Sequence, residues 1–151
     1  MRKKFIHLFL FFLFLQSCGY SPIYSVQNKT NFKFNIVEIN GSNEMNDKFN
    51  IQIKRFSNDT SSNEMDLKIL TFYEKNILSK NKKGEATKFL IRKKISFEVT
   101  NPEYKKNYSF SNETTINNIN DKFELDNYEN SIIENFISSK IEEFVLKLSQ
   151  N

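Results

Sequence analysis

Residues 86–100 read ATKFLIRKKISFEVT and contain the clearest strand pattern in the chain. Because side chains alternate between the two faces of a strand, one face of this segment is predicted to be apolar and buried, interrupted only at Lys93. The apolar residues of that face are Phe89, Ile91, Ile95, Phe97 and Val99. Asn101-Pro102 ends the strand, because proline cannot donate a hydrogen bond to a sheet ladder.

Similar alternation predicts two neighbouring strands, over residues 66–78 and residues 108–116. Short polar connections at residues 79–84 and 103–107 separate the three segments. Because connections of this length join antiparallel neighbours, the three strands are predicted to form a meander.

Another strand is predicted earlier in the chain, over residues 32–40, and Asn40-Gly41-Ser42 ends it as a turn in which Gly41 can adopt a positive φ. The alternation slips part-way along this strand. One side holds Phe32, Phe34 and Ile36, and the other holds Val37 and Ile39.

Residues 43–57 fit two patterns, a helix and a strand. Met45, Phe49, Ile53 and Phe56 have helical spacing, whereas Phe49, Ile51 and Ile53 alternate. The helix is favoured because its stripe is longer and because Ser42 or Asn43 can cap it.

A long amphipathic helix is predicted over residues 126–149, with Asp126 and Glu129 as a capping box. Its opposite face carries charges of both signs, which favours packing against the sheet over binding to a membrane surface. The apolar face consists of Tyr128, Ile132, Ile133, Phe136, Ile137, Ile141, Phe144, Val145 and Leu148. The element order strand, helix, three strands, helix belongs to the α+β class.

The chain begins with the pattern of an export signal. Three cations at residues 2–4 precede an apolar run of eleven residues, 5–15, that only His7 interrupts. Spanning a bilayer takes about 20 residues, so a permanent transmembrane helix is not expected here. The run ends in Leu15-Gln16-Ser17-Cys18, which is similar to a bacterial lipobox, in which the cysteine receives acyl chains such as palmitate and becomes the first mature residue. The alternative is an ordinary cleaved signal with a cysteine nearby.

Removal of residues 1–17 changes the charge of the protein. Of its 22 basic residues 19 remain against 18 acidic ones, so the net charge falls to +1, which disfavours nucleic-acid binding. The predicted organisation is a signal peptide at residues 1–17, a lipidated tether at 18–31 and a single α+β domain at 32–151.

The remaining residue types exclude much chemistry. The only histidine is lost with the signal, and the only cysteine is Cys18, so catalytic triads, imidazole or thiolate metal sites and disulfides are not expected. Three glycines cannot build a glycine-rich phosphate loop. Paired carboxylates remain possible, but the acidic residues are scattered along polar faces. We therefore expect no enzyme, cofactor or metal.

Residues 18–24, CGYSPIY, resemble the opening of the LptE family of lipopolysaccharide-assembly lipoproteins, in its alphaproteobacterial form. Further similarities are the strand that ends at Asn40-Gly41, the GEATK turn at residues 84–88 and the long C-terminal helix. Lys88 stands where the family usually has arginine, and lysine cannot make the bidentate contact with an anion that arginine makes.

The resemblance implies two helices packed on one face of a four-stranded sheet, anchored by lipid to the periplasmic side of the outer membrane. Family members sit as a plug inside the LptD β-barrel, help it to assemble and contact lipopolysaccharide. The residues expected to face this partner are Tyr20, Pro22 and Tyr24 of the tether and Leu70, Phe72 and Leu90 of the second sheet face.

Lys88, Arg92 and Lys94 share the strand face opposite Phe89 and Phe97. Such a stripe is a hypothetical binding site for the phosphates and sugar carboxylates of lipopolysaccharide. The alternative is ordinary solubilising charge, since lysines on strands also block aggregation.

Three functions remain possible. A partner of an outer-membrane barrel is favoured, and it predicts co-purification with a large β-barrel protein. A free-standing periplasm-facing lipoprotein that binds a small ligand predicts a pocket between the helices and the sheet, and a carboxylate enzyme predicts two acidic residues buried together in a cleft.

Overall fold

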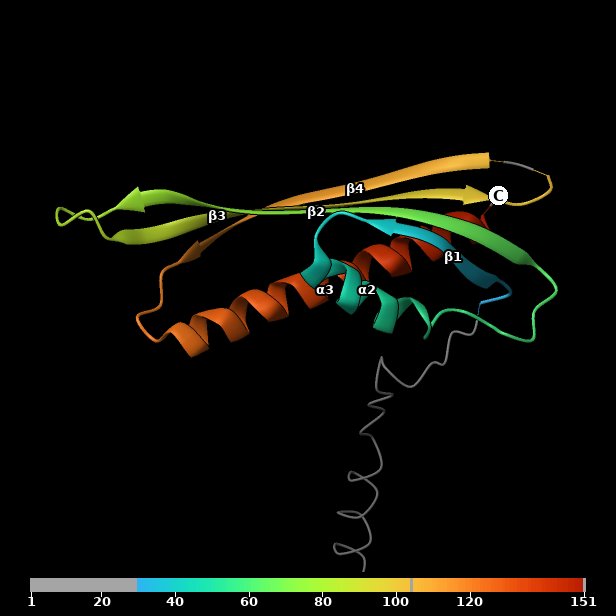
Figure 1. Cartoon of the computed structure of the whole chain (residues 1–151), viewed down its shortest axis with the longest axis horizontal. Helices are drawn as coiled ribbons and strands as arrows, with labels where there is room; N and C mark the ends of the chain where they lie inside the picture. The colour runs from blue at the N-terminus through green and yellow to red at the C-terminus, as the bar shows by residue number, and fades with distance from the viewer. Residues whose placement is uncertain (1–29, 104, 151) are drawn as a thin grey trace, which may run out of the picture.

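A computed structural model describes residues 30–103 and 105–150 of the chain. Four strands pair in sequence order into one sheet (Figure 1). They are β1 (Lys33–Asn40), β2 (Glu64–Lys80), β3 (Ala86–Thr100) and β4 (Lys105–Asn117). β3 has its predicted bounds, whereas β2 and β4 run slightly beyond theirs at both ends. The signal, Cys18 and the tether residues Tyr20, Pro22 and Tyr24 lie outside the described residues.

The predicted meander is confirmed, because β2, β3 and β4 pair antiparallel. β1 joins the other side of β2 in parallel. A parallel pair needs a crossover, and α2 (Asn43–Ile53) supplies it.

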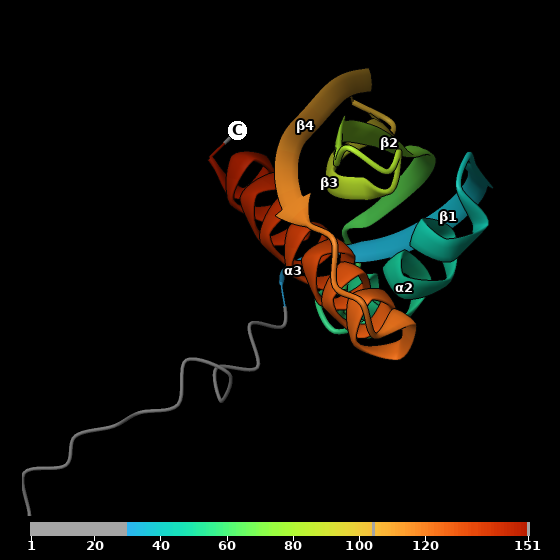
Figure 2. The same ribbon diagram turned by 90° about the vertical axis from the view of Figure 1, so that its left-hand side faces the viewer.

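Both helices lie on the same side of the sheet (Figure 1). α2 contacts β1 and β2, and α3 (Lys122–Ser149) contacts β3 and β4, an arrangement seen along the strands in Figure 2. This confirms the predicted α+β fold with two helices on one face. We call the sheet face that packs on the helices the inner face and the opposite one the outer face. No helix among the described residues is long and apolar enough to cross a membrane.

Stacked aromatic rings hold the layers together. The rings of Phe97 on β3 and Phe144 on α3 are nearly parallel, with centroids 4.2 Å apart. Phe49 of α2 and Phe110 of β4 pack against Phe97 at 5.7 and 5.8 Å. Because rings from α2, α3 and β4 all meet at Phe97, this residue of β3 joins both helices to the sheet.

The slip predicted in β1 is a β-bulge. The pairing with β2 shifts register between Ile36 and Glu38, and the side chain of Val37 is 58% exposed. The extra residue returns Ile39 to the side of Phe34 and Ile36, and all three pack against the core. The prediction that grouped Ile39 with Val37 was therefore wrong.

Gly41 adopts the predicted positive φ, +106°, in the turn between β1 and α2. A Cβ atom at this position would lie 1.8 Å from the carbonyl oxygen of Thr71. The Thr71 hydroxyl in turn accepts a hydrogen bond from the backbone N–H of Ser42 at 3.0 Å. The turn thus approaches β2 too closely for any residue other than glycine.

The helical interpretation of residues 43–57 is confirmed over its first eleven residues. Met45, Phe49 and Ile53 are buried, and Ile51 is 63% exposed, as helical spacing requires. Phe56 follows the end of the helix and packs against the core from a turn.

α3 begins at Lys122, before its predicted start. Its N-cap is Asp121, whose carboxylate accepts a hydrogen bond from the backbone N–H of Glu124 at 3.1 Å. The predicted capping box at Asp126 and Glu129 was wrong, because Glu129 instead accepts hydrogen bonds from Tyr73 and Lys75 of β2. Of the predicted apolar face, Tyr128 is 48% exposed, Ile132 and Val145 are half-buried, and the other six residues are buried.

Lys93 is buried on the inner face, with only 3% of its surface exposed. Its ammonium donates a hydrogen bond to the Thr114 hydroxyl at 3.1 Å and lies 5.6 Å from the centroid of the Phe136 ring. Burial lowers the pKa of Lys93, because the apolar surroundings disfavour the charged form.

We predict that Lys93→Met raises the free energy of unfolding by about 1–3 kcal/mol, because a weakly compensated buried cation is removed. The lowered pKa means that the folded protein binds fewer protons than the unfolded chain at alkaline pH below the ordinary lysine pKa. The free energy of unfolding of the unchanged protein therefore rises with pH there, and the substitution should remove that rise. Urea unfolding at several pH values measures both effects.

The matched control is Lys94→Met, one residue along and exposed on the outer face. It should change the free energy of unfolding by no more than about 0.5 kcal/mol. Equal effects of the two substitutions would contradict the assigned cost of burying Lys93.

Candidate functional site on the outer face of the sheet

The outer face is built from cross-strand rows of side chains. Successive rows join Lys68 to Glu98 and Asn107, Leu70 to Ser96 and Ser109, Phe72 to Lys94 and Ser111, Glu74 to Arg92 and Glu113, and Asn76 to Leu90 and Thr115. β2 contributes Leu70 and Phe72, β3 contributes Leu90 and most of the cations, and β4 contributes mainly small polar side chains. No helix or strand among the described residues covers this face (Figure 1).

Leu70 and Phe72 form the main apolar feature of the outer face. They lie in adjacent rows and are 55% and 48% exposed. Leu90, predicted to act with them, is half-buried and lies beyond the row that contains Arg92. The structure thus brings together two of the three predicted partner-facing residues of the sheet.

A shallow hollow of about 420 Å3 adjoins Leu70. All four strands line it, and its outer-face residues are Glu38, Asn40, Lys68, Leu70, Lys94, Ser96, Glu98, Asn107 and Ser109. Two ion pairs stand at its rim, Lys68–Glu38 at 3.8 Å and Lys105–Glu98 at 2.9 Å. Among the described residues, Lys94 has no ion pair, so its charge is available at the boundary between the hollow and Phe72.

The three predicted cations share the outer face, but their charges are not equivalent. Arg92 donates to Glu113 at 2.9 Å and to Glu74 at 3.2 Å, and the hydrogen bond to Glu113 is the main cause that raises the pKa of Arg92. This row has more negative than positive charge, so Arg92 is poorly suited to bind a further anion.

Lys88 and Lys94 lie on either side of the Arg92 row. They are six positions apart, a distance of about 20 Å along a strand. Among the described residues, Lys88 likewise has no ion pair. The cations therefore offer two separate points of contact for an extended anionic molecule, not one compact site.

Sequence reasoning missed the Glu74–Arg92–Glu113 row and the hollow. Both depend on which residues lie opposite one another on three strands, and the sequence does not specify that register.

The described residues contain no group of three or more His, Cys, Asp or Glu side chains placed to hold a metal ion. The space between the helices and the sheet is occupied around Phe97 by closely packed aromatic rings.

No protein-family model and no curated protein sequence matches the chain. Solved structures do match its fold. The rare lipoprotein B from Shewanella oneidensis aligns with a TM-score of 0.54 and 10% identity, over 77% of this chain and 95% of that chain. The minor lipoprotein from Acinetobacter baumannii aligns with a TM-score of 0.50 and 10% identity, over 76% of this chain and 93% of that chain. This chain shares the fold of bacterial lipoproteins.

We predict that Arg92→Gln raises the pKa of the Glu74 carboxyl toward its ordinary value. At present Asn76 and, second, Arg92 lower the pKa of Glu74 by hydrogen bonding to the charged form. Carboxyl titration followed by NMR measures the shift. Lys94→Gln is the control, and it should leave the pKa of Glu74 unchanged; a result in which both substitutions shift it equally would contradict the assigned hydrogen bond.

Proposed function

We propose that the protein is an outer-membrane lipoprotein of the LptE type, attached through acyl chains on Cys18, that works with an LptD-like β-barrel in delivering lipopolysaccharide to the cell surface. The observation that carries the proposal is the uncovered outer face, where Leu70 and Phe72 are exposed beside Lys94. The resemblance of residues 18–24 to the family's opening and the fold shared with bacterial lipoproteins support it.

The composition of the outer face suits the inside of a barrel. Barrel lumens are polar, and the β4 part of this face presents only polar side chains from Asn107 to Asn117. The exposed pair Leu70 and Phe72 supplies a small apolar contact, which is the usual character of the centre of an interface. A mainly polar face with a small apolar contact therefore fits a lumen better than it fits a lipid surface.

Acyl chains on Cys18 would be sufficient to hold the protein at a membrane. Each buried methylene contributes about 0.8 kcal/mol, and two acyl chains already hold a protein stably at a membrane. Residues 18–31 then act as the tether between the lipid and the domain.

Lys88 and Lys94 are the residues proposed to contact the phosphates of lipopolysaccharide. Their ammonium groups are available, whereas the guanidinium of Arg92 is held between Glu74 and Glu113. We expect Arg92 to position the neighbouring strands and to contribute little to binding the anion. The proposal assigns the protein a binding and assembly role without catalysis, metal or cofactor.

The protein purified from its native membrane is predicted to bring a large β-barrel protein with it. Lys88→Glu with Lys94→Glu should weaken lipopolysaccharide binding by about tenfold or more, because charge-assisted contacts contribute about 1.5–3 kcal/mol each. Arg92 is not substituted, since Arg92→Glu would place three carboxylates in one row. Binding to immobilised lipopolysaccharide and thermal unfolding measure affinity and folding in parallel.

The control reverses the same kind of charge on the helix side, with Lys54→Glu and Lys122→Glu, both exposed. It has the same net charge as the test variant and should bind like the unchanged protein. Equal loss in both variants would reject a specific role for Lys88 and Lys94, and purification without any barrel protein would reject the proposed partner.

A further inference from the structure

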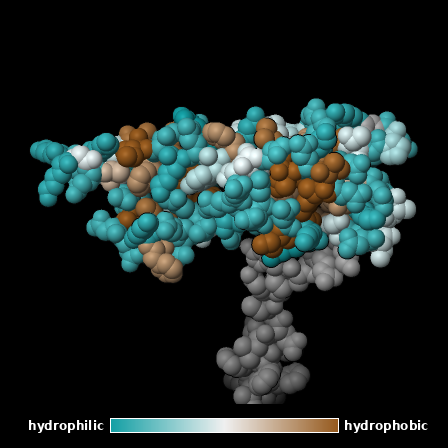
Figure 3. All heavy atoms as spheres, viewed as in Figure 1, coloured by the Kyte–Doolittle hydropathy of each residue, from teal (hydrophilic) through white to brown (hydrophobic). Residues whose placement is uncertain are grey.

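An apolar groove lies between β1 and the end of α2. Phe34 and Ile36 of β1 and Ile53 of α2 form its apolar walls. Lys54, Ser57 and Asp59 supply a polar rim, and its volume is about 510 Å3. Figure 3 shows hydrophobic surface gathered over this part of the molecule.

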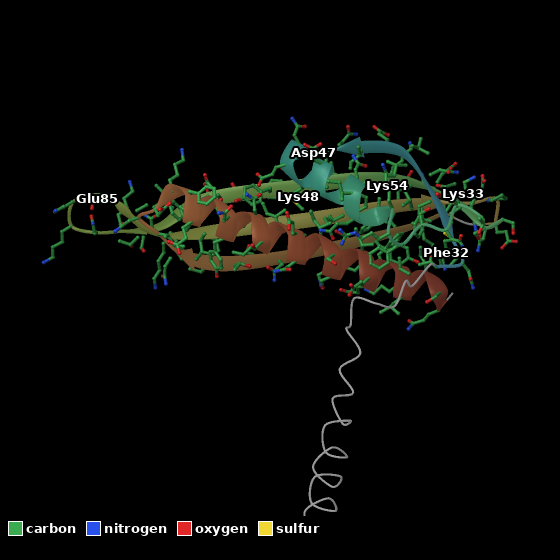
Figure 4. All side chains as sticks on the ribbon, turned by 90° about the horizontal axis from the view of Figure 1, so that it is seen from below. Phe32, Lys33, Asp47, Lys48, Lys54 and Glu85 are labelled. Atoms are coloured by element: carbon green, nitrogen blue, oxygen red, sulfur yellow. The ribbon has the colours of Figure 1, made fainter. Side chains whose placement is uncertain are left out.

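The N-terminal segment of the chain joins the domain beside this groove. The Thr30 hydroxyl donates a hydrogen bond to the carbonyl oxygen of Phe56 at 2.5 Å. The backbone N–H groups of Asn58 and Phe34 donate to the Phe32 carbonyl at 2.8 Å and to the Ser57 hydroxyl at 3.1 Å. These bonds fix residues 30–34 to the turn after α2, which carries the rim residue Ser57. Figure 4 places Phe32 and Lys54 in the same half of the molecule and Glu85 at the far end.

The sequence just before Thr30 has the composition that such a groove would accept. Residues 20–26 read YSPIYSV, and the polar residues 27–29 separate them from Thr30. Tyr24 precedes Thr30 by six residues, a reach of about 20 Å when extended. A segment on so short a connection has an effective concentration of about millimolar at its own groove, so a weak affinity is enough for docking.

We propose that residues 23–26 dock into this groove, with Ile23, Tyr24 and Val26 as the side chains that fill it. Tyrosine fits an apolar groove with a polar rim, because its ring can be buried while its hydroxyl bonds to the rim. Ser57 and Asp59 are the acceptors within that rim.

Docking would set how far the domain can stand from position 18. The twelve residues from Cys18 to Thr30 reach about 40 Å when extended, whereas the six from Cys18 to Tyr24 reach about 20 Å. The docked segment therefore halves the range of the tether. This inference does not depend on the proposed barrel partner or on lipidation.

Hydrogen exchange of the full mature protein, followed by mass spectrometry, tests the docking. Ile23→Ser, Tyr24→Ser and Val26→Ser are combined in one variant. Backbone amides of residues 34–37 and 53–57 should exchange about tenfold faster than in the unchanged protein, because the apolar cover is lost. Amides of residues 91–99, which are distant from the groove, should be unaffected.

The control variant combines Gln27→Ser, Asn28→Ser and Lys29→Ser, which leaves the apolar side chains in place and should exchange like the unchanged protein. Unchanged exchange in the test variant would overturn the proposal. Protection of the groove that depends on protein concentration would also overturn it, because a second copy would then be the occupant.

Disulfide trapping gives an independent measurement. In a Cys18→Ala form, Ser25→Cys with Ser57→Cys should cross-link within one chain under mild oxidation. Ser25→Cys with Ser96→Cys, on the outer face, is the control and should not. Equal cross-linking of the two pairs would contradict a defined docking position.

Discussion

The stacking of Phe97 on Phe144, with ring centroids 4.2 Å apart, is the contact on which the rest of the structure depends. It fixes α3 against the C-terminal half of β3, and Phe49 brings α2 to the same ring. Once Phe97 faces the helices, the alternation of the strand sends Arg92 and Lys94 to the other side of the sheet. Register then places Leu70 and Phe72 beside them on β2.

This constraint divides the molecule into a packed side and an open side. The inner face uses large apolar side chains and tolerates one buried lysine, Lys93, beside Thr114. The outer face instead carries ion pairs, small polar side chains and the exposed residues Leu70 and Phe72. Because both helices lie on the inner face, a partner has access to the whole width of the sheet, which is the property that the proposed function uses.

Local patterns in the sequence were sufficient to predict which segments form helices or strands and which residues lie on the same face of a strand. The bounds of β3, the choice of helix for α2 and the common face of Lys88, Arg92 and Lys94 all follow from periods of two or 3.6 residues. Features that depend on distant residues were not predictable in this way. The bulge at Val37 depends on pairing with β2, and the hydrogen bonds of Glu129 to Tyr73 and Lys75 depend on where α3 crosses the sheet. The neutralised charge of Arg92 likewise depends on the register of three strands.

The central claim is that the outer face around Phe72 is where a barrel partner binds. Photo-cross-linking in the native cell tests it most directly, with a photoreactive amino acid placed at position 72 or, as the control, at the exposed position 135 of α3. The account predicts that position 72 gives an adduct with a large outer-membrane β-barrel protein and that position 135 does not. An adduct with the barrel from position 135 and none from position 72 would contradict it.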